Sequence, residues 1–136
     1  MAAPESPDPH ALAAAMPFAV AAGVEVTSAT AEEVRGRLAW AADRCTSGGV
    51  LHGGAIMTLA DTLGAICAFL NLPPGAGTST IESKTNFFAA VRAGHIEGVT
   101  HPLHIGRRTI VVQTDVRDAT GRRVAQITQT QAVLTD

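Results

Sequence analysis

The segment that most constrains the fold is residues 53–70, an apolar stretch without proline that carries one acid, Asp61. At about 100° per residue its large side chains gather on one face, which predicts a helix lying on a sheet. The helix should end before the stop signals Pro73, Pro74 and Gly75. The face expected on the sheet consists of Ile56, Leu59, Ala60, Leu63, Ile66, Cys67 and Leu70.

Asp61 points away from that face, where its neighbours are Met57, Gly64, Ala65 and Ala68. These residues are small or apolar, so we expect the helix to be covered on this side as well. A chain of 136 residues is enough for one domain, and the second cover is then most simply another subunit. Asp61 is expected near that interface, either bonded to a partner's backbone or acting as a catalytic base or nucleophile.

Strand-like segments surround this helix. Two short strands are expected between Val24 and Trp40, and four more over residues 78–88, 95–105, 109–117 and 124–134. A lone helix needs a sheet to cover it, and strands joined by short turns favour antiparallel pairing, which predicts an α+β fold. Residues 1–16 are expected to form an N-terminal tail, disordered over its first eight residues, and a short helix stopped by Pro17. Residues 17–136 form the expected domain.

Composition argues against several classes of protein. Hydrophobic residues make up 46% of the chain and charged residues 16%, which favours a packed core over disorder. The net charge of -2 provides no basic field for nucleic acid or an anionic membrane. No uninterrupted apolar run is long enough to predict a membrane span, and no signal peptide is recognised, so a cytoplasmic protein is expected. Two cysteines, Cys45 and Cys67, imply no disulfide framework.

The predicted helix begins with Leu51-His52-Gly53-Gly54. The first N–H groups of a helix have no internal partner and favour negative charge, such as the oxyanion of a tetrahedral intermediate. The two glycines allow either a ligand or a packed neighbour to approach closely. Gly53 and Asp61 are separated by about 12 Å along the helix axis, so one small reacting group cannot touch both. If both serve one reaction, they come from different copies of the helix.

These residues give the chain a resemblance to the hotdog-fold acyl-CoA thioesterases, in particular the phenylacetate-degradation (PaaI-like) branch, over roughly residues 18–134. The resemblance implies a long central helix wrapped by an antiparallel β-sheet, homodimers with a continuous sheet, and often homotetramers. It also implies hydrolysis of an acyl-CoA thioester without metal or cofactor. The matching residues are Leu51-His52-Gly53-Gly54, Leu59-Ala60-Asp61, Gly64, Thr80-Ile81-Glu82, Asn86-Phe87, Gly106-Arg107, Gly121-Arg122 and Val124-Ala125.

By position, the resemblance implies catalytic roles for three residues. The backbone N–H of Gly53, together with that of Gly54, would polarise the thioester carbonyl. Asp61 of the other subunit would attack the carbonyl carbon or activate a water molecule. Thr80 falls where relatives place a hydroxyl that orients this water, and His52 would shape the turn or bond the substrate.

Three further residues are candidates for substrate binding. Thr46 stands where relatives often carry an asparagine near the reacting carbonyl, and its hydroxyl offers one donor hydrogen where an amide offers two. The alternative is that Thr46 is an ordinary loop residue. Arg107 and Arg108 follow Gly106 in a predicted turn, where their guanidinium groups could meet the phosphates of CoA or simply be solvated.

Other functions on the same fold stay open at this point. One is a non-catalytic module that binds or senses acyl-CoA, although a pure binder gains little from an acid facing an apolar pocket. The other is a hydratase or dehydratase, whose typical motif is not found. The sequence leaves open the acyl group, the choice between dimer and tetramer, and whether Asp61 is a nucleophile or a general base.

Overall fold

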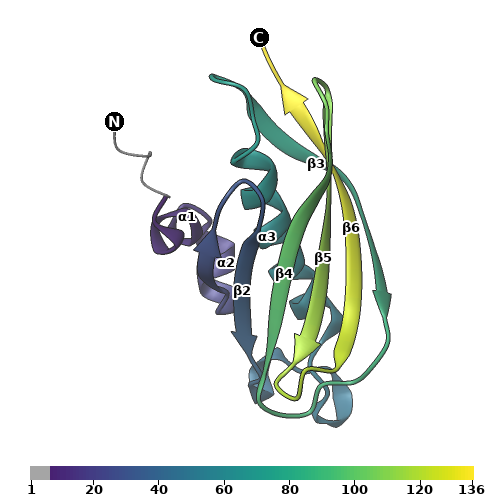
Figure 1. The fold of residues 1–136 in the computed structure, drawn as a ribbon. Coiled ribbons are helices and arrows are strands. Elements are labelled where there is room, and N and C mark those ends of the chain that lie inside the picture. Colours follow the sequence, from purple (N-terminus) through teal and green to yellow (C-terminus); the bar gives the residue numbers. More distant parts are fainter. Residues whose placement is uncertain (1–6) are drawn as a thin grey trace.

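The computed structural model describes residues 7–136, and in this part of the chain a six-stranded antiparallel sheet curves around one long helix (Figure 1). The predicted α+β class is thereby confirmed. The predicted disorder of the tail falls largely on residues 1–6, which lie outside the described residues.

The sheet order is β1-β2-β4-β5-β6-β3. The elements are α1 (Pro9–Ala14), α2 (Pro17–Ala22), β1 (Glu25–Ala29), β2 (Val34–Ala39), two 3-10 turns (Ala42–Arg44 and Ser47–Gly49), α3 (Gly53–Phe69), β3 (Gly77–Phe87), β4 (His95–Ile105), β5 (Thr109–Asp118) and β6 (Arg123–Leu134).

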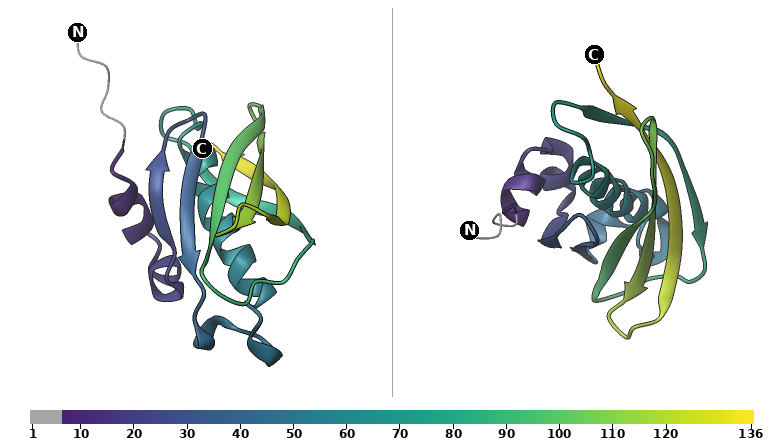
Figure 2. Two further views of the ribbon diagram at one scale, coloured as in Figure 1. Left: turned by 60° about the horizontal axis from the view of Figure 1, so that its bottom comes forward. Right: turned by 45° about the horizontal axis from the view of Figure 1, so that its top comes forward.

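Helix α3 lies in the hollow of the curved sheet (Figure 2). The predicted sheet-facing residues from Ile56 to Cys67 are all buried, and Leu70 is partly buried. Complete burial of a side chain such as Leu59 or Leu63 stabilises the fold by about 1.5–3 kcal/mol. Asn71 donates from Nδ2 to the carbonyls of Cys67 and Ala31. The first bond pairs a carbonyl in the last turn of α3, and the second connects this end of the helix to the turn between β1 and β2. No helix in the described part of the chain is both long and apolar enough to cross a membrane.

The far side of α3 is covered in part by the chain's own sheet. Met57 and Asp61 are exposed and Ala65 is half-buried, but Gly64 and Ala68 are buried. The expectation that another subunit covers these last two residues is therefore wrong. At Gly64 the reason is the curvature of the sheet, which brings the Gln129 side chain of β6 against this residue.

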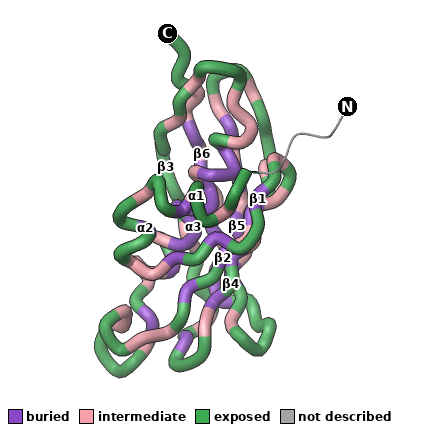
Figure 3. Tube along the Cα trace, turned by 90° about the vertical axis from the view of Figure 1, so that its left-hand side faces the viewer, coloured by how far each residue is buried: buried purple, intermediate pink, exposed green. Residues whose placement is uncertain are grey.

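Two short helices precede the sheet where one was expected. Pro17 does not only stop the first helix but also begins α2, because proline is well tolerated at the first position of a helix. Ala13 of α1 and Ala19 of α2 are buried. The α1 helix packs against β1, and α2 packs against α3 (Figure 3).

A β-bulge divides the long strand β3. Its pairing with β6 shifts register between Thr80 and Glu82, so that Ile81 is an extra residue. Residues directly opposite in an antiparallel pair share a face of the sheet. Thr80 lies opposite Gln131 and Ser83 opposite Gln129, so both point to the face that covers α3 although they are three residues apart. β3 ends the sheet, and among the described residues it pairs only with β6.

Candidate active site

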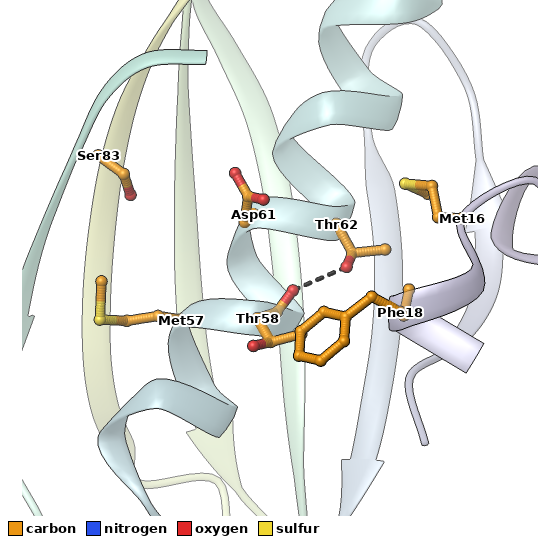
Figure 4. Close-up of a pocket in the computed structure, with 8 residues that line it drawn as sticks. Met16, Phe18, Met57, Thr58, Asp61, Thr62 and Ser83 are labelled. Atoms are coloured by element: carbon orange, nitrogen blue, oxygen red, sulfur yellow. Dashed lines mark hydrogen bonds between the residues drawn. The ribbon is translucent and has the colours of Figure 1, made fainter. Parts of the chain in front are cut away.

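Asp61 lies in the middle of α3 and lines a cavity of about 440 Å³ (Figure 4). The cavity is bounded by α3, by the segment from the end of α1 into α2, and by β3. Its other lining residues are Met16, Phe18, Ala19, Met57, Thr58, Thr62 and Ser83. The acid predicted to be functional is therefore accessible to a small molecule.

One carboxylate oxygen of Asp61 is held by the neighbouring strands. Gln129 donates from Nε2 to Oδ1 at 2.8 Å, and the Thr80 hydroxyl approaches the same oxygen at 3.4 Å. Gln131 in turn donates to the Thr80 hydroxyl at 2.9 Å. Within residues 7–136, Oδ2 has no hydrogen-bond donor and no basic side chain pairs with the carboxylate. Asp61 thus has one positioned oxygen and one that is free to act as a base or nucleophile.

Gln129 holds Asp61 and was not predicted from the sequence. Its side chain is fully buried, and its Oε1 has no hydrogen-bond partner in the described structure. A methyl group on Gly64 would stand 1.8 Å from that Oε1, so only glycine leaves room for the amide. Turning the amide over would place its carbonyl oxygen against the carboxylate, which fixes Nε2 toward Asp61.

A signal for Gln129 was present in the sequence. Strand residues alternate between faces, so the inward position of Ile127 predicts that Gln129 and Gln131 also point inward. Amides at core positions need partners, because an unpaired buried polar group is costly. The partners here are Asp61 and Thr80.

The cavity contains several hydroxyl groups, and most are already engaged. Thr58 and Thr62 donate to helix carbonyls one turn back, at 2.8 Å and 2.7 Å (Figure 4 draws the second bond). On the strand side, Ser83 lines the cavity and was not predicted, and the Thr80 hydroxyl already donates to Asp61. The structure therefore brings the predicted pair Asp61 and Thr80 together within one chain.

At the start of α3 the two glycines differ. The Gly54 N–H donates to Nδ1 of His52 at 2.8 Å, so His52 caps the helix and this N–H is occupied. The Gly53 N–H has no acceptor among residues 7–136. The Phe87 ring packs against Gly53, where an added methyl group would stand 3.1 Å from its nearest atom. Gly53 is therefore the available backbone donor, at the positive end of the helix dipole.

The remaining predicted residues lie elsewhere in the chain. Thr46 is exposed in the loop before α3, and its backbone N–H donates to Val50. Arg107 and Arg108 are exposed in the β4–β5 turn. That turn adjoins Thr109, which pairs with Ala132, whereas Phe87 beside Gly53 pairs with Ala125 at the opposite end of β6. One chain therefore does not bring the two arginines to Gly53.

Comparison with known proteins gives a consistent result. A family model described as the thioesterase superfamily matches residues 48–125. The 1,4-dihydroxy-2-naphthoyl-CoA hydrolase of Escherichia coli (strain K12) is 34% identical over 86 residues, covering 63% of each protein. The proofreading thioesterase EntH of Cronobacter sakazakii is 35% identical over 86 residues, again covering 63% of each.

Solved structures resemble the fold over a longer part of the chain. A mutant thioesterase from Pseudomonas aeruginosa has a TM-score of 0.90 at 23% identity, covering 96% of both chains. A mutant of the phenylacetic acid degradation protein PaaI from Thermus thermophilus has a TM-score of 0.79 at 27% identity, covering 87% of this chain and 99% of that one. The chain spans 63% of the length of the two curated relatives above. The family match includes Gly53, Asp61 and Thr80 but ends before Gln129.

Proposed function

The chain belongs to the thioesterase superfamily, and we propose that it hydrolyses an acyl-CoA thioester to the free acid and CoA. Its fold is the predicted hotdog fold, a long central helix wrapped by an antiparallel sheet. The observation that carries the proposal is the Asp61 carboxylate, which is open to a cavity and held through one oxygen by Gln129 and Thr80.

The proposed reaction uses the free oxygen of Asp61. As a general base, this oxygen takes a proton from water while the water oxygen bonds to the thioester carbon. The carbon–sulfur bond then breaks, and the proton passes to the departing CoA thiolate. As a nucleophile, the same oxygen bonds to the carbon itself while the carbon–sulfur bond breaks and CoA leaves as the thiolate. Water then cleaves the resulting anhydride, which releases the acid and restores the Asp61 carboxylate, and a proton from this water passes to the thiolate. In both cases the Gly53 N–H donates to the carbonyl oxygen as negative charge develops on it.

The proposed site is shared between two subunits. Gly53 and Asp61 are separated by about 12 Å along α3, which is too far for one carbonyl group. β3 is an unusually open edge of eleven residues, with Ile81 and Phe87 each more than half exposed. Pairing of two such edges would continue the sheet, bury these side chains and bring a second α3 close. We therefore propose a homodimer in which Gly53 of one subunit serves Asp61 of the other.

The remaining roles in the proposal follow from position. Thr80 orients the attacking water beside Asp61, and His52 holds the helix start through its bond to Gly54. Thr46 is proposed to contact the substrate near the reacting carbonyl, and Arg107 and Arg108 are proposed to contact the phosphates of CoA, because all three side chains are exposed and polar.

Release of free thiol from a panel of alkyl- and aryl-CoA esters tests the activity. The wild-type protein should release CoA, and Asp61→Asn should lose nearly all turnover while keeping its melting temperature. Asp136→Asn is a matched control, because this exposed acid lies outside any helix or strand. Folded wild-type protein that binds these esters without cleaving any would indicate a binding module instead.

Mixed dimers test the shared site. Gly53→Pro removes the proposed donor, and proline suits this position because it is the first of the helix and His52 is extended with ψ 134°. Gly53→Ala keeps the N–H and measures the contact with Phe87 alone. Each dimer with one Gly53→Pro subunit and one Asp61→Asn subunit would retain one intact site, so a random mixture should recover about a quarter of wild-type activity. A mixture as inactive as its parents would contradict a site built from two subunits.

A further inference from the structure

A second cavity of about 360 Å³ adjoins the cavity of Asp61. It lies between α1 and α3, and Met16 lines both cavities. Ala65 and Ile66 of the second cavity follow Asp61 and Thr62 of the first by one turn of α3, so the two cavities lie end to end along the helix, and together they are called the trough. The second cavity is lined by Pro7, Asp8, Ala11, Leu12, Ala15, Met16, Ala65, Ile66, Phe69 and Thr78.

The floor of the trough follows successive turns of α3. Asp61, Ala65 and Phe69 are four residues apart in turn, which places them along one side of the helix. From Asp61 to Phe69 this path is about 12 Å long. Leu12 and Met16 from the N-terminal helices form one wall, and Thr78 of β3 lies on the other.

The second cavity offers almost no hydrogen bonding to a ligand. Thr78 donates its hydroxyl to the Ala132 carbonyl at 2.8 Å, and Asp8 accepts from the His10 N–H at 3.0 Å. All the other lining side chains are hydrocarbon or thioether groups. A polar acyl group would lose its bonds to water here without replacement, whereas an alkyl chain gains from leaving water.

We propose that this trough is the acyl-chain subsite and that the substrates are CoA esters of unbranched, saturated acids. The inference rests on the proposed thioester hydrolysis, because the thioester carbonyl must sit at Asp61 for the chain to lie along α3. An extended chain advances about 1.3 Å per bond, so 12 Å holds about eight to ten carbons. Octanoyl-CoA and decanoyl-CoA are therefore the best substrates.

Asp8 places a negative charge at the end of the trough that is farther from Asp61. It precedes α1, at the opposite end of this helix from Met16, which lies beside the Asp61 cavity. A chain that ends in a second carboxylate would bring two negative charges together in an apolar groove. CoA esters of dicarboxylic acids of the same length are therefore poor substrates.

The experiment measures kcat/KM for a series from butanoyl-CoA to tetradecanoyl-CoA. We expect kcat/KM to rise about fourfold per methylene until the trough is full and then to stop rising. Ala65→Leu places a branched side chain in the floor, one turn from Asp61. It should lower kcat/KM for decanoyl-CoA by at least about tenfold and leave butanoyl-CoA within about twofold. Ala14→Leu is the matched control, because Ala14 is exposed on α1 and does not line the trough.

Two outcomes overturn the inference while leaving the proposed function intact. One is a rate that does not depend on chain length. The other is an equal loss for all chain lengths in Ala65→Leu together with a changed oligomeric state by gel filtration, which would indicate that a second copy of the chain covers the trough.

A binding measurement separates the inference from catalysis. Asp61→Asn protein is titrated by calorimetry with non-hydrolysable alkyl thioethers of CoA in the same length series. Affinity that rises with length in this protein, and fails to rise when Ala65→Leu is added, supports the subsite even if no ester is hydrolysed. Affinity independent of length contradicts it.

Discussion

Gln129 donates from Nε2 to Asp61 Oδ1 at 2.8 Å, and this bond connects a side chain with no exposed surface to one that is open to solvent. The position of the amide is fixed, because its side chain packs against Gly64 and its backbone belongs to β6. The carboxylate on the exposed outer side of the helix therefore takes its orientation from a buried strand.

Replacing Gln129 should lower kcat more than it raises KM. A hydrogen bond to a charged group contributes about 1.5–3 kcal/mol, so Gln129→Leu is expected to reduce kcat by about tenfold to a hundredfold. KM should change by less than about threefold, because the amide lies behind Asp61 and not in the cavity. Steady-state kinetics with the preferred ester checks this.

The matched control is Gln126→Leu. Gln126 lies on the same strand and also donates to an aspartate, Asp115, at 3.2 Å, but on the outer face of the sheet. It should leave both kinetic constants unchanged. Equal losses in the two variants would mean that Gln129 acts only through the stability of β6.

Gly64→Ala should lower both the free energy of unfolding and the activity, because a single clash causes both effects. The new methyl group would meet Gln129 Oε1 at 1.8 Å, which forces the amide away from Asp61. Overpacking of this kind costs about 1–3 kcal/mol. Urea unfolding should show that adding Gln129→Ser restores most of this stability while activity stays low. Gly77→Ala is the comparison, because nothing lies within 4 Å of its added methyl group and it should cost little.

Cys67 should resist thiol reagents until the protein unfolds. Burial raises the pKa of its thiol to about 11, so almost no thiolate exists at pH 8, and the side chain has no exposed surface. Cys45 is only partly buried. Titration with an aromatic disulfide should modify one thiol per native chain and two in denaturant. With Cys45→Ser the native chain should show none, and a fast-reacting thiol in that variant would contradict the burial of Cys67.

Asp118 should make the fold sensitive to acid. The Thr120 hydroxyl, followed by the Arg122 and Thr120 N–H groups and the Arg122 charge, holds the pKa of this carboxyl below its ordinary value of 3.8. The unfolded chain therefore binds a proton first, and the stabilisation present at neutral pH declines as the pH falls below about 4. In Asp118→Asn the free energy of unfolding should be lower at pH 7 and should change less on acidification. An unchanged slope in this variant would exclude Asp118 as a source of the acid sensitivity.

The sequence predicted the elements well because their signals are local. The start of α3 is marked by glycines before residue 55, and prolines after residue 72 stop the helix. For β4, alternating polar and apolar residues between short turns predicted the same limits that the structure shows, His95–Ile105. The second N-terminal helix was missed because Pro17 carries two opposite signals, a stop for one helix and a start for the next. Only the tertiary context decides between them.

Part of the candidate site follows from the sequence. Asp61, Gly53 and Thr80 were proposed from it, and the structure places Thr80 beside Asp61. Ser83 could not be found by simple alternation, since the bulge at Ile81 changes the face on which it lies. The distance of Arg107 from Gly53 depends on the register of β5 with β6, which is a relation between distant segments that no local pattern encodes.

The bulge at Ile81 also changes which residues of β3 face the helix. Before it, Thr78 and Thr80 face the helix, and after it Ser83, Thr85 and Phe87 do so. Deleting that single residue would reverse the facing of every side chain in one half of the strand relative to the other. Either the hydroxyl beside Asp61 or the aromatic ring beside Gly53 would then turn outward. One inserted amino acid thus lets the same strand contact both the start and the middle of α3, and a strand without it could contact only one of them.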